Sequence, residues 1–320
     1  MPVEKHVMPA GKHVMPAGKH VIPVEKHVIP VEKHVMQKHV MPVGKGVGGL
    51  GALLQEIHTS SKYRTVCEEV IRNIGQKELS KRRNRKEAVK ETKNTLHQIA
   101  GAYLDHKPNY AEMLSLLNAA SASEDPNVFR ATCRQAMQNH ASARERLPFL
   151  EEFYGTVMGG IGPITSLLDV ASGLNPLAIP WMPLAPHAVY HACDLYTDMM
   201  AFLESFFPLA GIMGTTVACD VLTSPPTQAV DVALVLKVLP PLEQLDKAAG
   251  LRLLKALEAQ YLLVSFPTRT LGGRNKRMAE NYEAHFREMI QGEPWEVERF
   301  LFETELCFRV RVTLTEGVRP

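Results

Sequence analysis

The chain has 320 residues, of which 45% are hydrophobic and 22% charged, so it can form one large or two modest domains with real cores. It contains no run of 18 apolar residues, which argues against a membrane-spanning helix, and its first residues lack the apolar core of a signal peptide. The net charge of +2 hides a basic block at residues 62–93, where eleven Lys and Arg stand against five Glu.

Residues 1–35 are five copies of a seven-residue unit such as MPVEKHV, and degenerate copies follow up to residue 47. A period of seven would suit a coiled coil, but each full copy contains a proline, which removes a helix donor and clashes with the preceding turn. Without aromatic residues such a segment buries too little to order itself. We expect residues 1–47 to be a disordered tail whose histidines bind metals only loosely.

Residues 48–155 carry the periodicity of helices. The stretch YRTVCEEVIRNI places Val66, Val70 and Ile74 on one face, and residues 139–154 are predicted to form one further helix. This segment is therefore expected to be a helical domain that precedes an α/β domain over residues 156–320.

The helical segment also carries a dense group of cations. A charge run usually marks a solvated helix face, but five cations within six residues favour contact with phosphates, which positions a protein on nucleic acid without reading its sequence. The predicted phosphate contacts of this segment are Lys62, Arg64, Lys81, Arg82, Arg83, Arg85 and Lys86.

From residue 164 onward, short apolar runs alternate with helical segments. Strands are predicted at residues 166–170, 188–193, 214–219, 232–236 and 262–266, with room for crossover helices between most of them. This spacing predicts a parallel, doubly wound sheet. The alternating C-terminal stretch VERFLFETELCFRVRVTL predicts two more strands, one of them inserted antiparallel.

Three of the predicted strands end in an acid: Asp169, Asp194 and Asp220. Ligands of such sheets bind at the carboxyl ends of the strands. An acid next to the first glycine is unfavourable for a pyrophosphate, and the second and third glycines of a dinucleotide site are missing. A strand-terminal Asp can also simply cap the next helix. Three in order, with Gly173 after the first, favour S-adenosylmethionine, whose ammonium group, ribose hydroxyls and adenine amine would meet Asp169, Asp194 and Asp220 respectively.

Seven stretches resemble, in order, the motifs of the aminoglycoside-resistance 16S rRNA methyltransferases, which methylate guanine N7 at position 1405. They are SKYRTVC, LHQIAGAY, HASARERL, DVASGLNPLA, ACDVL, LKVLPPLE and SFPTRTLGGR. The resemblance covers residues 54–313 and implies a Rossmann-like S-adenosylmethionine-binding sheet behind a helical domain that docks on the 30S subunit. Ser172 and Ala143 depart from the family pattern, and no acid is lost.

The resemblance also implies site residues. The cofactor contacts carried over by motif are Tyr103, His140, Ala141, Ser142, Arg146, Ala171, Asp194, Asp220, Val221, Leu236 and Gln244. An arginine such as Arg146 would pair with the donor's carboxylate, and His97 is expected to support the pocket from an apolar helix face. A loop after the fifth strand is expected to close on the flipped guanosine through Phe266, Arg269, Arg274, Lys276 and Arg277.

The expected function is methylation of 16S rRNA in the decoding region of the 30S subunit, conferring aminoglycoside resistance. Guanine N7 already presents a lone pair, so no catalytic base is expected. The alternatives are a methyltransferase for another rRNA or tRNA base, a non-catalytic ribosome-binding relative and, most distantly, a Rossmann oxidoreductase. Five scattered cysteines without a CxxC pair predict reduced thiols, no metal site and a cytoplasmic protein, which is expected to be a monomer.

Overall fold

The computed structural model describes residues 48–101, 103–104, 107–270, 273–274 and 277–313, all of which belong to one unit of the chain, Gly44–Pro320. The predicted repeat tail at residues 1–47 lies outside the described residues, as does Lys276.

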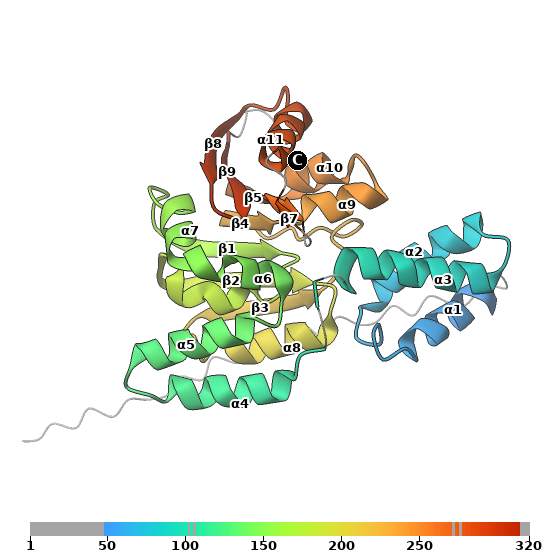
Figure 1. Cartoon of the computed structure of the whole chain (residues 1–320), viewed down its shortest axis with the longest axis horizontal. Coiled ribbons are helices and arrows are strands. Elements are labelled where there is room, and N and C mark those ends of the chain that lie inside the picture. Colours follow the sequence, from blue (N-terminus) through green and yellow to red (C-terminus); the bar gives the residue numbers. More distant parts are fainter. Residues whose placement is uncertain (1–47, 102, 105–106, 271–272, 275–276, 314–320) are drawn as a thin grey trace, which may run out of the picture. The chain divides into compact units, whose positions relative to one another are not determined.

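Three helices open the described chain and lie side by side in Figure 1: α1 (Gly48–His58), α2 (Glu68–Lys81) and α3 (Arg85–Leu96). The predicted apolar face of α2 is confirmed for Val70 and Ile74, which are buried. Val66 lies before the helix and forms an isolated bridge with Tyr196. A short π-helix, η1 (His97–Gly101), follows α3.

Five further helical segments of the described chain precede the sheet. The helices α4 (Tyr110–Ser121) and α5 (Pro126–Met137) are followed by α6 (Ala141–Arg146), the 3-10 turn η2 (Leu147–Phe149) and α7 (Leu150–Val157). The prediction of a single helix over residues 139–154 is therefore wrong. Pro148 has no N–H to bond to the preceding turn, so the chain tightens into η2 before α7 begins.

The sheet has seven strands in the order β3-β2-β1-β4-β5-β9-β8. Its strands are β1 (Ile164–Val170), β2 (Leu184–Asp194), β3 (Met213–Ala218), β4 (Val230–Leu236), β5 (Ala259–Pro267), β8 (Trp295–Leu301) and β9 (Glu305–Val312). The first five run parallel, and β9 is inserted antiparallel between β5 and β8. The predicted doubly wound α/β sheet and its antiparallel insertion are confirmed.

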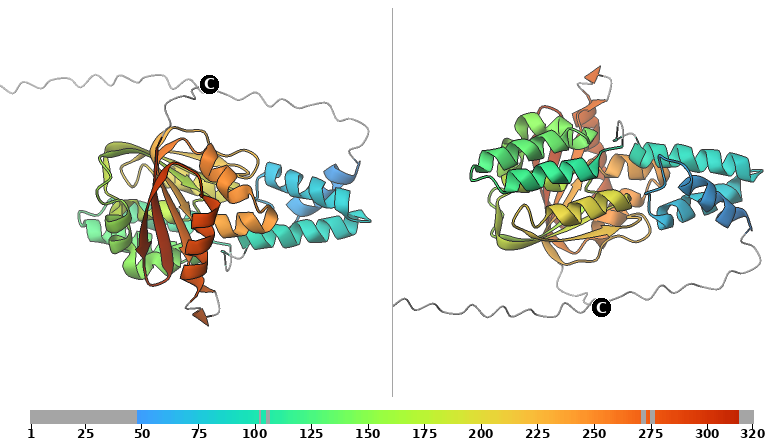
Figure 2. Two further views of the ribbon diagram at one scale, coloured as in Figure 1. Left: turned by 90° about the horizontal axis from the view of Figure 1, so that it is seen from above. Right: turned by 90° about the horizontal axis from the view of Figure 1, so that it is seen from below.

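Helices cover both faces of this sheet (Figure 2). One face packs against α7, α8 (Thr197–Phe206) and the 3-10 helix η3 (Asn175–Trp181), and the other against α9 (Leu239–Leu245), α10 (Ala249–Ala256) and α11 (Met278–Met289). Along β4, Val232 and Leu234 face the first layer, whereas Ala233 and Val235 face the second, as the period of two requires. A strand pair, β6 (Arg269–Thr270) and β7 (Gly273–Arg274), follows β5.

Two features bring the N-terminal helices to the sheet. The first core includes buried side chains of α1, α2 and α3 together with those of β1, β2 and β4, so these helices share one core with the sheet. In addition, residues 219–229 connect β3 to β4 through turns and extended chain rather than a crossover helix. Helix α2 contacts this connection. The Asn73 amide donates to the side chains of Asp220 and Thr223, and Glu69 accepts from the Ser224 hydroxyl.

Candidate functional site

A cavity of about 950 Å³, counting its open mouth, lies at the carboxyl ends of β1, β2, β3 and β4. The sheet order places β1 next to β4, which is the point where crossover connections leave in opposite directions and where ligands of open α/β sheets bind. Most of the predicted cofactor contacts line this cavity: Tyr103, His140, Ser142, Arg146, Asp169, Ala171, Asp194, Asp220, Val221 and Leu236.

Two of the three acids are anchored by backbone amides. Asp194 is the last residue of β2, and its carboxylate accepts from the N–H groups of Gly173 (2.9 Å) and Leu195 (2.7 Å). Asp220 follows β3 and accepts from the Leu222 N–H at 3.0 Å and from the Asn73 side chain at 2.8 Å. Both carboxylates are largely buried, and burial raises the pKa of Asp194 although its amide donors work in the opposite direction.

The third acid, Asp169 on β1, lies deeper in the structure. Its Oδ2 accepts from the Tyr190 hydroxyl at 2.7 Å and from the Asn175 amide at 2.8 Å. Burial raises the pKa of Asp169 to about 7, even though these two hydrogen bonds favour the ionised form. The carboxyl is thus poised between its protonated and ionised states near neutral pH, and a cation brought beside it would favour the ionised state.

Gly173, a predicted cofactor contact, is not itself among the lining residues, but it fits closely against His140, which lines the cavity. Gly173 has a φ of 52°, a conformation that a side chain disfavours, and a Cβ there would lie 2.6 Å from the His140 ring. The ring stacks on Tyr103 with centroids 5.9 Å apart. Desolvation lowers the pKa of His140 to about 4, and Lys237 adds to the effect, so this imidazole is neutral at physiological pH. Ala141, also predicted as a cofactor contact, is not among the residues that line the cavity. Its backbone N–H donates to the Tyr103 carbonyl at 2.9 Å.

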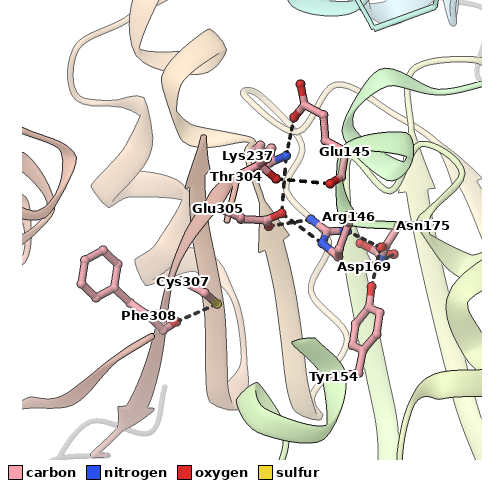
Figure 3. A network of polar contacts seen from close by, with 10 residues as sticks. All are labelled: Glu145, Arg146, Tyr154, Asp169, Asn175, Lys237, Thr304, Glu305, Cys307 and Phe308. Atoms are coloured by element: carbon pink, nitrogen blue, oxygen red, sulfur yellow. Dashed lines mark hydrogen bonds and ion pairs between the residues drawn. The ribbon is translucent and has the colours of Figure 1, made fainter. Parts of the chain in front are cut away.

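A buried network of charges includes Arg146 and Lys237, which line the cavity (Figure 3). The Arg146 guanidinium donates to both oxygens of Glu305, at 2.6 and 3.1 Å, and to the Asn175 carbonyl at 2.8 Å. The Lys237 ammonium lies between two acids, at 2.7 Å from Glu145 and 3.4 Å from Glu305. Arg146 and Glu305 are 1% and 0% exposed, so each charge depends on the other for compensation.

The pKa values of this network follow from its geometry. Burial opposes the charge of Arg146, but Glu305 outweighs it and raises the pKa of the guanidinium. Burial would likewise raise the pKa of Glu305, but Arg146, and then Lys237, hold it below its usual value. Lys237 also has a φ of 62°, a strained conformation for a residue with a side chain, directly after β4 where its neighbours border the cavity.

Several lining residues were not predicted. Asn175 and Lys237 lie beside recognised motif positions, in GLNP and LKVLPP, and their polar character in apolar surroundings was a usable signal. Val70 and Ile99 reach the cavity from the N-terminal helices, which no local pattern indicates. Gln244, which was predicted, lies on α9 outside this cavity and borders two neighbouring hollows instead.

The predicted RNA contacts fall into separate groups. Residues 81–86 are exposed at the turn between α2 and α3. The exposed Lys62 lies near the other end of α3, where its Nζ is 3.0 Å from Nδ1 of His97, and Arg64 lines a hollow with Lys62 and Lys107. The 12 residues of α3 correspond to about 18 Å at 1.5 Å per residue. The predicted contacts therefore form two groups, one near each end of α3, rather than one cluster.

Two expectations about aromatic residues are corrected. Phe266 is fully buried and packs against Tyr282, Phe286 and Phe308, so it belongs to the core and not to an RNA-contacting surface. The reason is that β5 has a strand on either side and that α11 covers the face of β5 on which Phe266 lies. His97, expected as a buried support of the pocket, is exposed and contacts Lys62.

The backbone of Arg269 and Arg274 pairs across the β6–β7 hairpin just after β5. All five cysteines are buried and free, as predicted. Within the described ranges, no helix has the length and apolar character needed to cross a bilayer. The same residues contain no group of three or more His, Cys, Asp or Glu arranged to hold a metal ion.

Several known proteins are similar to this chain over most of its length. The family model described as "Ribosomal RNA methyltransferase (FmrO)" matches residues 59–309. A 16S rRNA (guanine(1405)-N(7))-methyltransferase of Frankia casuarinae is 37% identical over 273 residues, which cover 84% of this chain and 96% of the relative. A protein of the same name from Micromonospora echinospora is 35% identical, and the alignment covers 80% of this chain and 94% of the relative.

Solved structures give the same result. One similar structure is that of the 16S rRNA methyltransferase RmtF in complex with S-adenosyl-L-homocysteine, whose sequence is 31% identical to this chain. The two structures superpose with a TM-score of 0.71 over 83% of this chain and 99% of RmtF. The 16S rRNA methylase RmtB is 29% identical with a TM-score of 0.68. The family match spans most of the chain and includes every strand that forms the cavity. The chain therefore belongs to the ribosomal RNA methyltransferase (FmrO) family, the membership that its motifs predicted.

Proposed function

We propose that this protein methylates N7 of the guanine at position 1405 of 16S rRNA in the 30S subunit, with S-adenosylmethionine as donor, and thereby confers resistance to aminoglycosides. The curated relatives carry this activity in their names. The observation that carries the proposal is the set of three acids, Asp169, Asp194 and Asp220, gathered at one cavity. The protein would act in the cytoplasm as a monomer, with residues 48–155 as the docking part and residues 156–320 as the cofactor-binding part.

The residues present fit the cofactor. When bound, S-adenosylmethionine supplies an electrophilic methyl group on a sulfonium. Asp194, held by the amides of Gly173 and Leu195, would accept from the ribose hydroxyls, and Asp220 would accept from the adenine amine. A Cβ at Gly173 would displace the His140 ring from the cavity edge.

The methionine end of the cofactor would meet Asp169 and Arg146. An ammonium group beside Asp169 would stabilise the ionised form of the carboxyl. Because the pKa of Asp169 is about 7, a small decrease in this pKa is enough to keep the carboxyl ionised at neutral pH. In the described part of the chain, Arg146 uses three of its five N–H groups on Glu305 and Asn175. The other two would be available for the donor's carboxylate.

The described side chains suit a reaction without a general base. Guanine N7 offers its lone pair directly, so the protein's contribution is alignment, which can lower a barrier by about 7–11 kcal/mol. The neutral His140 adds no positive charge beside a cationic donor. Rigid support comes from Arg146, Glu305 and Lys237, which fix α6 against the ends of β4 and β9.

Binding of the 30S subunit is assigned to the basic residues along α3. Cations at both ends of a helix about 18 Å long can reach more than one phosphate, which favours docking over a single ionic contact. The N7 edge of a paired guanine is inaccessible in the deep major groove of RNA. The base would therefore be flipped out, with Arg269, Arg274, Lys276 and Arg277 closing on it.

The test is methylation of purified 30S subunits with S-adenosylmethionine, followed by borohydride and aniline treatment and primer extension. Strand scission at position 1405 is expected, because only an N7-methylated guanine is cleaved in this way. Asp194→Ala should abolish scission, whereas Glu151→Ala, which removes an exposed acid on α7, should not. Scission at another position, or a methylated product that aniline does not cleave, would overturn the assignment.

A further inference from the structure

Helix α2, in the part of the chain assigned to RNA docking, carries one residue of the cavity wall and a second residue that contacts one of the cavity's acids. Val70 lines the cavity wall, and Asn73 lies three residues further along the same face of the helix. The Asn73 amide donates to Oδ2 of Asp220 at 2.8 Å and to the Thr223 hydroxyl at 3.0 Å. The contact with Asp220 joins residues 147 positions apart.

Asp220 depends on such a contact because of its position. It follows β3 in a connection without a crossover helix, so its carboxylate is held by the Leu222 N–H on Oδ1 and by Asn73 on Oδ2. Two bonds, one on each oxygen, fix the plane of the carboxylate. Each oxygen keeps a further lone pair, because a carboxylate can accept about four hydrogen bonds.

We propose that Asn73 is a positioning residue for the cofactor: it orients Asp220 so that a lone pair of that carboxylate faces the adenine amine. This rests on the proposed contact between Asp220 and adenine. The group acts through Asp220 and need not touch the cofactor itself. The proposal makes α2 a part of the cofactor site as well as of the surface that carries Lys81.

The experiment compares two ligands that differ at one group of the purine. S-adenosylhomocysteine has an amine at C6, and S-inosylhomocysteine has an oxygen there, which cannot donate to a carboxylate. In calorimetry, the dissociation constant of the Asn73→Ala variant for S-adenosylhomocysteine should be about tenfold higher than that of the wild type. A loss of this size is typical of removing a hydrogen bond to a charged group. Its affinity for S-inosylhomocysteine should change much less, so the preference for adenine falls.

A matched control is available in the same contact region. The Ser224 hydroxyl donates to Glu69 on α2 at 2.7 Å, outside the cavity. Ser224→Ala removes a helix–turn hydrogen bond of similar length and should leave both affinities within about twofold. Asn73→Leu keeps the volume of the side chain without its N–H groups, so it should show the same selective loss as Asn73→Ala; a loss seen with Ala but not with Leu would assign the effect to side-chain volume and contradict the proposal.

The outcomes separate this proposal from the one on which it rests. Equal losses for both ligands, or no loss for either, would show that Asn73 only joins the helix to the turn. A wild-type protein that binds both ligands equally would contradict the contact between Asp220 and adenine and remove the proposal with it. Neither result would alter the position of the methylated base, which the cleavage assay reports independently.

Discussion

Replacing Glu305 with glutamine removes the negative charge at the centre of the buried network while keeping the shape of the side chain. Arg146 is 1% exposed and donates to both oxygens of this carboxylate, and Lys237 lies 3.4 Å from one of them. Glutamine offers one acceptor and turns an amide N–H₂ group toward two cations. The variant would therefore contain a buried guanidinium with a much weaker partner.

The expected cost is about 3–5 kcal/mol in the free energy of unfolding, the range found when one member of a buried ion pair is removed. For a chain of this size about 2 °C is lost per kcal/mol, which gives a fall of about 6–10 °C in the unfolding midpoint. Urea unfolding at neutral pH measures the first quantity, and a thermal scan measures the second.

A surface pair of the same chemistry provides the control. Glu298 pairs with Arg309 at 2.6 Å, the same distance as the Arg146–Glu305 pair, but its side chain is 61% exposed. Glu298→Gln should cost less than about 1 kcal/mol, because solvent screens the exposed charge. Similar small losses in both variants would refute the argument that burial makes Glu305 essential.

Three further predictions test the cavity and the docking surface. Asp169→Asn should change the pH dependence of the free energy of unfolding. The stability of the wild type relative to the variant should fall as the pH rises from about 4 to about 7, because the folded carboxyl keeps a proton that the unfolded chain has released. Urea unfolding at several pH values measures this, and parallel stability profiles for the two proteins would contradict it. Gly173→Ala places a Cβ 2.6 Å from the His140 ring and should weaken S-adenosylhomocysteine binding at least about tenfold in calorimetry, whereas Gly211→Ala, at a φ of 68° with open space around it, should not. Reversing residues 81–83 to glutamate should weaken 30S binding in filter assays without changing cofactor affinity, and an equal loss of both would indicate misfolding rather than lost phosphate contacts.

The fold could be predicted largely from local patterns. The five parallel strands are short apolar runs at regular spacing, and the C-terminal hairpin alternates, so each signal lies within one strand. The errors have local causes that tertiary structure decides. Pro148 interrupts a helix whose periodicity continues on both sides. Phe266 is predicted as an RNA contact at the end of its strand because the sequence does not show that α11 covers this side chain through Tyr282 and Phe286.

The site was predictable where its residues belong to one strand end. Asp169, Asp194 and Asp220 each follow an apolar run, so topology alone brings them together. Residues that complete the site from distant segments were missed, among them Asn73 and Glu305. Glu305 did carry a signal, an acid within the apolar stretch LFETELCF, but its partner lies 159 residues earlier and cannot be found from spacing.

The insertion of β9 between β5 and β8 has a consequence for how the protein is made. Arg146 and Lys237 are both translated before Glu305, the first residue of β9, whose carboxylate contacts both cations in the folded protein. A chain interrupted between residues 237 and 305 therefore contains Arg146 without its carboxylate partner and Lys237 with Glu145 as its remaining acid. All residues that line the cavity precede residue 243, but Arg146 and Lys237 among them gain the Glu305 carboxylate only when β9 is made. A premature stop in β8 should therefore yield an inactive product even though every acid of the cavity has been synthesised.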